Sequence, residues 1–339
     1  IKQLIVRIFL MTNGDYLKQE SGGKTKVILV SRVHKEAADE RMMKLVDEYE
    51  FIESIPEQFK EYFPRILLYG IEKNKAFYEM EHYDLPTLRR LMLANEITED
   101  EILHWADKIT SVSRQLYLHE VLPTPEEYFN VMHFDRLDNR LKELSKKSNW
   151  FKELISKEYV VVNGKEYKNI PVLVDKFRNK KFISTVQPEF VGRWSHSDLH
   201  FSNVLIDRRN DRFIMIDPRG YDYCDYYYDY GKFWHSVNGK YEMIASRNFD
   251  MDGSNFELFD NQMFKLCESL KLSLPEILCK YSSEDYNDVM KKTEWNEVMH
   301  FASLIPFLLD FDGVDARSKV AYYTSVILIN DFCEKYEIN

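Results

Sequence analysis

The residues with the clearest capacity for chemistry lie in one short segment and just after the strands predicted to follow it. Asp198 stands five residues before Asn203, and Asp217 follows Asn203 by fourteen residues. A carboxylate can accept the proton of a hydroxyl group, and an amide with a second carboxylate can hold Mg²⁺ against nucleotide phosphates. These residue types at this spacing predict phosphoryl transfer from ATP to an alcohol.

The elements around these residues have to bring Asn203 and Asp217 together. Taken singly, Asp198 could be a turn or cap residue and Asp217 a strand-end turn, but the three together favour the catalytic interpretation. A hairpin between Asn203 and Asp217 would return the second carboxylate to the first loop. The pattern predicts a loop, a strand, a polar turn and a returning strand at residues 198–203, 204–207, 208–211 and 212–216.

The same residues carry a family resemblance. The chain reads His-Ser-Asp-x-x-x-x-Asn at 196–203 and Ile-Asp-Pro at 216–218, where protein kinases have H-R-D-x-x-x-x-N and D-F-G. It resembles the aminoglycoside phosphotransferase and choline kinase branch of the kinase-like fold, whose loop is typically H-G-D-x-x-x-x-N. Within that branch it is similar to uncharacterised bacterial phosphotransferases tied to capsule or surface-polysaccharide synthesis, most strongly at 194–241.

The resemblance implies a fold and several residue roles. The fold would be α+β, a bilobal protein-kinase-like structure with a small strand-rich nucleotide-binding lobe (1–83) and a larger, mostly helical catalytic and substrate lobe (84–339). His196 would support the loop, and Asp229 would be a structural carboxylate, although a helix N-cap is an equally good interpretation of Asp229. Ser197 replaces the usual Gly or Arg, and the loss of Arg suits a small-molecule kinase.

Local patterns also divide the chain near residue 84. Strand-like runs surround one amphipathic helix before this point, and helical periodicity dominates after it. Thr87 and Thr98 are predicted helix N-caps. The first part is expected to contain strands at 1–11, 26–30, 66–69 and 76–80 and a helix at 37–55. The second part is expected to contain helices at 88–93, 99–118, 126–156, 285–309 and 314–336 and a hairpin at 159–165.

The nucleotide side has weaker signals. Gly22 and Gly23 lie in Ser-Gly-Gly-Lys-Thr, which can cover phosphates because Gly lets backbone N–H groups approach closely. A plain hairpin turn is an equal interpretation, and the first glycine of a Walker A motif is absent. By resemblance, Glu81 and Tyr83 belong to the hinge whose backbone hydrogen-bonds adenine.

The resemblance also implies a lysine paired with a helical glutamate, which would hold the α- and β-phosphates. Lys35 is the best match for the phosphate-binding lysine and Glu48 for its partner, with a solvated lysine before a helix as the alternative. Eleven residues separate Gly23 from Lys35, which is short for the two strands that the fold would normally place there. Lys26 or Arg32 could then hold the phosphate instead.

The substrate side is the least defined. His200, Arg219 and Asp222 are candidate contacts, and Arg219 could meet a phosphate or an acidic sugar. The tyrosine-rich segment 221–230 could bind a sugar or a quaternary ammonium group, although an ordered loop of packed tyrosines is favoured. We expect a small hydroxylated acceptor, a sugar or surface-polysaccharide precursor, with an aminoglycoside or choline-type kinase as the alternative. A nucleotide-binding pseudokinase or interaction protein is an alternative of another class.

Bulk composition narrows the partners. The net charge of −10 argues against a nucleic-acid partner. No run of about 18 apolar residues occurs, so no membrane span is expected. The cysteines lack CxxC spacing, which favours reduced thiols and a cytoplasmic location. The expected cofactors are ATP or GTP and Mg²⁺.

Overall fold

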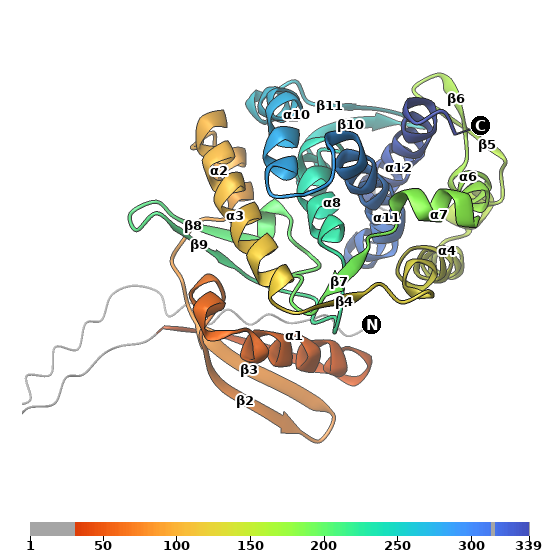
Figure 1. The fold of residues 1–339 in the computed structure, drawn as a ribbon. Helices are drawn as coiled ribbons and strands as arrows, with labels where there is room; N and C mark the ends of the chain where they lie inside the picture. Colours follow the sequence, from red (N-terminus) through yellow and green to blue (C-terminus); the bar gives the residue numbers. More distant parts are fainter. Residues whose placement is uncertain (1–30, 313–315, 339) are drawn as a thin grey trace, which may run out of the picture.

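The computed structural model describes residues 31–312 and 316–338, which form a mixed α+β structure with small antiparallel sheets (Figure 1). The strands expected at 1–11 and 26–30 lie outside the described residues, as do Gly22, Gly23 and Lys26. Among the described residues, no helix is both long enough and apolar enough to cross a membrane.

A three-stranded antiparallel sheet forms one side of the structure. Its order is β1-β3-β2, with β1 at Arg32–Ala38, β2 at Ile66–Glu72 and β3 at Lys75–Glu81. The predicted strands at 66–69 and 76–80 are confirmed. The helix expected from residue 37 starts later, because Ala37 pairs with Ala76 in the β1–β3 ladder. A short turn, η1 (Asp39–Arg41), then leads into α1 (Met42–Ser54).

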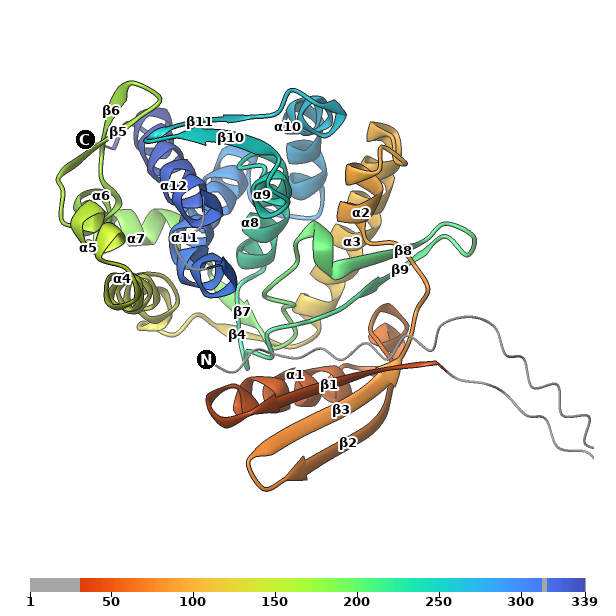
Figure 2. The same cartoon turned by 180° about the vertical axis from the view of Figure 1, so that it is seen from behind.

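Helix α1 belongs to two hydrophobic cores. It lies along the sheet on the side that faces the helical part (Figure 2). Leu45 and Val46 pack with Tyr78 in a small core under the sheet. Phe51 and Ile52 belong instead to a larger core shared with the helical part. The first half of α1 therefore packs on the sheet, and its last turns pack on the helical part.

The rest of the described chain is mostly helical. It contains four two-stranded sheets, β4-β7, β5-β6, β8-β9 and β10-β11. The helices and helical turns are η2 (Glu57–Tyr62), α2 (Leu88–Leu93), α3 (Glu99–His119), η3 (Asn130–Asp135), α4 (Arg136–Lys147), α5 (Asn149–Ile155), α6 (Ile170–Phe177), α7 (Lys180–Val186), η4 (Phe201–Asn203), α8 (Tyr226–Val237), α9 (Tyr241–Ala245), α10 (Gln262–Lys280), α11 (Tyr286–Asp312) and α12 (Ala316–Lys335). The strands are β4 (Val121–Pro123), β5 (Tyr159–Val162), β6 (Lys165–Lys168), β7 (Phe190–Gly192), β8 (Val204–Asp207), β9 (Arg212–Met215), β10 (Phe249–Asp252) and β11 (Asn255–Leu258).

Several local predictions are confirmed. Thr87 and Thr98 cap α2 and α3 by accepting hydrogen bonds from backbone N–H groups, at 3.1 and 3.3 Å. Asn163 and Gly164 both have positive φ, as the predicted two-residue hairpin turn requires. The segment 126–156 is not one helix, because Ser148 is extended and caps α5. Turn and cap signals act locally, which is why sequence alone reveals them.

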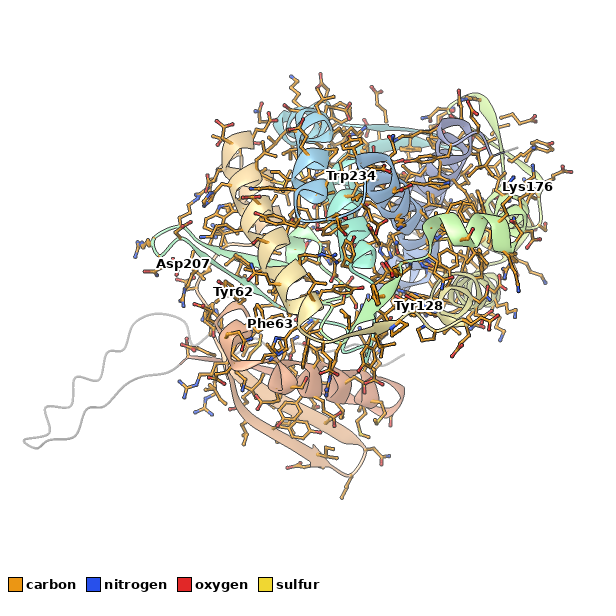
Figure 3. The ribbon with its side chains drawn as sticks, in the orientation of Figure 1. Tyr62, Phe63, Tyr128, Lys176, Asp207 and Trp234 are labelled. Atoms are coloured by element: carbon orange, nitrogen blue, oxygen red, sulfur yellow. The ribbon has the colours of Figure 1, made fainter. Side chains whose placement is uncertain are left out.

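The prediction that the tyrosine-rich segment 221–230 is a loop is wrong for its second half. The loop ends at Asp225, and α8 begins at Tyr226. Asp225 caps the helix, and Tyr128 (labelled in Figure 3) donates to its carboxylate at 2.9 Å and accepts from its backbone N–H at 2.8 Å. Asp225, and not Asp229, is therefore the N-cap. Every residue of α8 is buried. A helix buried on all sides has no polar face, so periodicity could not reveal it.

The predicted hairpin is confirmed as β8 and β9, and it lies inside the larger core. Phe201, Val204 and Phe213 are fully buried there. Two aromatic residues at the end of η2 pack against this region (Figure 3). Tyr62 stacks on Phe213 with ring centroids 5.1 Å apart, and the rings of Phe63 and His196 are stacked with centroids 6.4 Å apart. The loop that carries the motif is thus packed from both the sheet side and the helical side.

Candidate active site

The loop between β7 and η4 is fixed by a buried carboxylate of α8. Asp229 is 4% exposed and accepts a hydrogen bond from the Ser195 hydroxyl at 2.7 Å. Burial raises the pKa of Asp229 to about 7, although the backbone N–H groups of His196, Ser197 and Leu199 favour its charged form. Asp229 thus gathers several consecutive loop residues around one point.

His196 and Ser197 shape the turn that leads into Asp198. Nε2 of His196 donates to the carbonyl of Ile216 at 2.9 Å, and Nδ1 accepts from the backbone N–H of Asp198 at 3.2 Å. Burial lowers the pKa of His196 to about 4, so the ring is neutral at pH 7. Ser197 adopts φ +62°, a left-handed conformation that favours Gly. His196 and Ser197 thus fix the conformation of the loop before Asp198.

Asn203 and Asp217 are brought together by the hairpin. The backbone N–H of Ile216 donates to the carbonyl of Asn203 at 2.9 Å. Nδ2 of Asn203 donates to the carbonyl of Asp198 at 2.9 Å, which turns the amide oxygen away from that carbonyl. The side chain of Asp217 is 47% exposed. One amide oxygen and one accessible carboxylate suit Mg²⁺, which takes few protein ligands and completes its shell with water and phosphate.

Asn203 and Asp217 by themselves do not form a complete protein-only metal site. In the described part of the chain, no three His, Cys, Asp or Glu side chains gather in a way that could hold a metal ion. The donor set at Asn203 and Asp217 fits a metal ion that arrives with nucleotide phosphates better than a permanently bound structural ion.

Lys35 connects the sheet to the end of the hairpin. It lies in β1, and its Nζ is 2.5 Å from the carboxylate of Glu48 in α1 and also contacts the carboxylate of Asp217. Glu48 is 8% exposed and accepts a second hydrogen bond from the Tyr78 hydroxyl at 2.5 Å. Burial alone would lower the pKa of Lys35, but Asp217 and Glu48 outweigh it and raise the pKa well above its ordinary value. Lys35 is a partly buried, charged group whose side chain is 15% exposed, and not a solvated lysine.

The alternative phosphate ligand Arg32 is placed differently. Its side chain is 57% exposed and pairs with Glu79 at 2.5 Å on the surface of the sheet. Among the predicted candidates that the structure describes, Lys35 is therefore the one next to Asp217.

Asp198 is held by two cations. Its carboxylate lies 2.9 Å from the Arg219 guanidinium and 3.0 Å from Nζ of Lys232 in α8. Its side chain is 15% exposed. Burial would raise the pKa of Asp198, but Arg219 and Lys232 hold it well below the ordinary value. Asp198 is therefore an anion at neutral pH, with both of its oxygen atoms engaged.

The segment after Asp217 touches α1 directly. Gly220 has φ +67°, and a Cβ atom at this position would lie 2.4 Å from the backbone of Asp47. Only Gly allows this approach. Burial lowers the pKa of the neighbouring Lys44 of α1. The positive charge of Arg219 lowers this pKa further, and the negative charge of Asp198 opposes the shift. This contact sets the position of Arg219 relative to α1.

Buried Glu242 supports the other end of the loop. It is fully buried and takes hydrogen bonds from the ring of His200 at 3.1 Å and from the Ser202 hydroxyl at 2.9 Å. Arg89 of α2 pairs with it at 3.4 Å. Burial would raise the pKa of Glu242, but His200 and Arg89 keep it below its ordinary value. Glu242 thus positions η4, which carries Asn203.

The remaining predicted residues are more peripheral. Glu81 ends β3, and its side chain accepts from the Tyr83 hydroxyl at 3.3 Å. Asp222 is exposed. Burial raises the pKa of Asp47, and the negative charges of Glu50 and Asp222 raise it further. His200 faces Glu242. Adenine contacts for Glu81 and Tyr83, and substrate contacts for His200 and Asp222, stay predictions.

Sequence reasoning missed Lys232, Tyr78, Gly220 and Glu242. A signal existed for Lys232, which lies three residues after Asp229 and would share its helix face if α8 had been recognised. Tyr78 and Glu242 act through contacts between distant segments, so no local pattern marks them. The need for Gly at position 220 arises only from the approach of α1.

The chain was also compared with known proteins. No protein-family model matches it, and no curated protein sequence matches it either.

Proposed function

We propose that this chain is a phosphotransferase that moves the γ-phosphoryl group of ATP or GTP to a hydroxyl group of a small molecule, a sugar or surface-polysaccharide precursor. One observation carries the proposal: Lys35 of β1 contacts Asp217 after β9 while Glu48 of α1 holds it. A lysine–glutamate ion pair beside a metal-binding carboxylate is what kinases use to hold Mg-ATP.

A bilobal protein-kinase-like fold is part of this proposal. Residues 1–83 would form the nucleotide-binding lobe and residues 84–339 the catalytic and substrate lobe. Two observations support the division. The sheet and one side of α1 enclose a small hydrophobic core of their own, and one of the two larger cores lies wholly within the helical part.

The reaction assigns a separate task to each group. Asp198 accepts the hydroxyl proton while the acceptor oxygen forms its bond to the γ-phosphorus and the bond to the bridging β,γ-oxygen breaks, which releases ADP or GDP. Lys35 holds the α- and β-phosphates, and Asp229 and His196 keep the Asp198 loop in place. Mg²⁺, when bound by Asn203 and Asp217, supplies positive charge to the phosphate oxygens.

The first test is nucleotide binding followed by turnover. Mg-ATP and Mg-GTP at saturating concentration should each be compared with Mg²⁺ alone, and the preferred nucleotide should raise Tm by roughly 4 °C. Product formation is then measured with sugars, aminoglycosides and choline as acceptors. Asp198→Asn should lower kcat at least about 100-fold and keep the nucleotide-induced shift.

Asp211→Asn is the matched control. It changes a carboxylate in the exposed turn of the same hairpin, where Asp211 pairs with His104 and Lys108, and it should leave turnover unchanged. Turnover that survives Asp198→Asn would show that Asp198 is not the base. A nucleotide shift without turnover on any acceptor would favour the pseudokinase, and no shift would contradict both functions.

A further inference from the structure

We propose that the acceptor itself carries a carboxylate or a phosphate, and that a basic cluster of Arg136, Arg219 and Lys232 binds this negative charge. The inference rests on the phosphotransfer function proposed above and names the chemical class of its acceptor.

Three elements bring the cluster together. Lys232 lies one helical turn after Tyr228 in α8. The guanidinium of Arg136, at the start of α4, lies 5.4 Å from the centre of the Tyr228 ring. Arg219 comes from the loop after β9, and its guanidinium lies 2.9 Å from the Asp198 carboxylate. Nζ of Lys232 lies 3.0 Å from the same carboxylate. The three cations therefore surround one side of Asp198.

A second set of contacts confirms that α4 and the Arg219 loop meet. Arg140, one turn after Arg136, lies 4.5 Å from the centre of the Phe307 ring in α11. Arg219 lies 5.9 Å from the centre of the same ring. Arg140 is neutralised by Glu143 of its own helix at 2.8 Å, so we leave it out of the cluster.

The cluster has more positive than negative charge. Asp198 pairs with both Arg219 and Lys232. Within the described residues, Arg136 has no ion pair, and its cation–π contact is with Tyr228. Burial, together with repulsion from Arg219, lowers the pKa of Arg136. Excess charge in a poorly solvated place is unfavourable unless an anion joins it.

The cluster is separate from the groups proposed to hold the nucleotide. Lys35 is paired with Glu48 and Asp217. In both ribbon views, α4 and the β8–β9 hairpin lie on opposite sides of α8 (Figures 1 and 2). Helix α4, which carries Arg136, thus lies on the side of α8 away from the hairpin, and we place the entry of the acceptor on this side.

An anionic acceptor would lie next to the proposed base. In the structure both oxygen atoms of Asp198 are engaged by Arg219 and Lys232. An acceptor carboxylate or phosphate that binds the same two cations would place its hydroxyl group beside the Asp198 carboxylate.

The experiment compares acceptors that differ in charge. Glucose, glucuronate and glucose 6-phosphate are tested at equal ionic strength, by Tm shift without nucleotide and by kcat/KM with Mg-ATP. We expect one of the two anions to give a Tm shift that glucose does not, and a kcat/KM at least about ten-fold higher. The two anions distinguish a carboxylate acceptor from a phosphate acceptor.

Arg136→Met is the decisive variant, with Lys142→Met as its control. Lys142 is an exposed cation of the same helix. Arg136→Met should raise KM for the anionic acceptor about ten-fold or more and leave KM for ATP within two-fold, and Lys142→Met should change neither. A rise in KM for ATP instead would assign the cluster to the nucleotide phosphates.

The failures of the two proposals differ. Equal kcat/KM for neutral and anionic acceptors would overturn the inference and leave the phosphotransferase intact. Anion-induced Tm shifts that Arg136→Met removes would support the basic cluster even if Mg-ATP gave no turnover. An absence of both charge preference and anion-induced shift would also overturn it.

Discussion

Asp198 belongs to the loop before η4, whereas Asp229 packs against the same loop from α8, and their surroundings shift their pKa values in opposite directions. Asp198 faces the cations Arg219 and Lys232, and its pKa is well below the ordinary value. Asp229 faces a hydroxyl and backbone N–H groups, and burial raises its pKa to about 7. Burial acts in the same direction on both carboxylates, so the presence of a full positive charge decides the difference.

The difference fits the proposed roles, in which Asp198 is the base and Asp229 is a structural carboxylate. A group that has to accept a proton must be ionised before the reaction starts, and the two cations keep Asp198 ionised. A group that only gathers backbone N–H donors does not need a cation. The following predictions test this distinction.

Loss of one cation beside Asp198 should have the largest effect on stability. Lys232→Met leaves a largely buried carboxylate with one cation fewer, and it should lower the free energy of unfolding by about 3 kcal/mol at pH 7. Urea denaturation measures this. Lys280→Met is the control, since it breaks an exposed pair with Asp107 at 2.8 Å and should have little effect.

Adding Asp198→Asn to Lys232→Met should recover part of that loss, because both charges of this pair are then gone, although Arg219 also loses its carboxylate partner. If the two single losses simply add in the double variant, the two side chains are not coupled and Lys232 does not hold Asp198.

The position of Arg219 should depend on Gly220. Gly220→Ala places a Cβ atom 2.4 Å from the Asp47 backbone at φ +67°, and it should lower the free energy of unfolding by about 2 kcal/mol more than Gly253→Ala. Gly253 has a similar φ of +61°, but a Cβ atom there would meet none of the described atoms within 4 Å. Equal losses in the two variants would mean that the approach of α1 is not tight.

Asp229 should make stability depend on pH. An unfolded Asp ionises near pH 4, whereas Asp229 in the folded chain ionises near 7. Between these values the folded state keeps a proton that the unfolded state has released, so stability falls as pH rises, by up to about 1.4 kcal/mol per pH unit. Asp229→Asn should remove this part of the slope in urea titrations between pH 5 and 7.

Asp207→Asn provides the contrast. Hydrogen bonds from Asn210 and Arg212 lower the pKa of Asp207, so its contribution is lost only as the pH falls through values below 4. The slope between pH 5 and 7 should therefore match that of the unmodified chain. An unchanged slope in Asp229→Asn would mean that Asp229 is already ionised at pH 5.

The smallest expected effect concerns Ser197, which stands between the two carboxylates. Its φ of +62° favours Gly, and its hydroxyl donates to the carbonyl of Ser195 at 3.2 Å. Ser197→Gly and Ser197→Ala both lose this hydrogen bond, but only Gly relieves the backbone. The Gly variant should be more stable than the Ala variant by about 1 kcal/mol in urea denaturation. An Ala variant of equal or greater stability would contradict the left-handed conformation.

Much of the fold could be predicted where the signal is local. Caps at Thr87 and Thr98, the turn at 163–164 and the β8–β9 hairpin depend on residues within a few positions of one another. The start of α1 and the whole of α8 could not be predicted. In the first case, strand pairing with β3 overrides the helical preference of Ala37, and in the second, complete burial removes the polar face that periodicity needs.

The candidate site divides along the same line. The sequence by itself determined the Asp198, Asn203 and Asp217 motif, because a loop and a hairpin hold these groups close along the chain. Only the tertiary structure decided that Lys35, 182 residues from Asp217, reaches its carboxylate, and that Lys232 and Arg136 come to lie around Asp198. Charge environments arise from side chains on distant segments, and residue types and local spacing do not record which segments will meet.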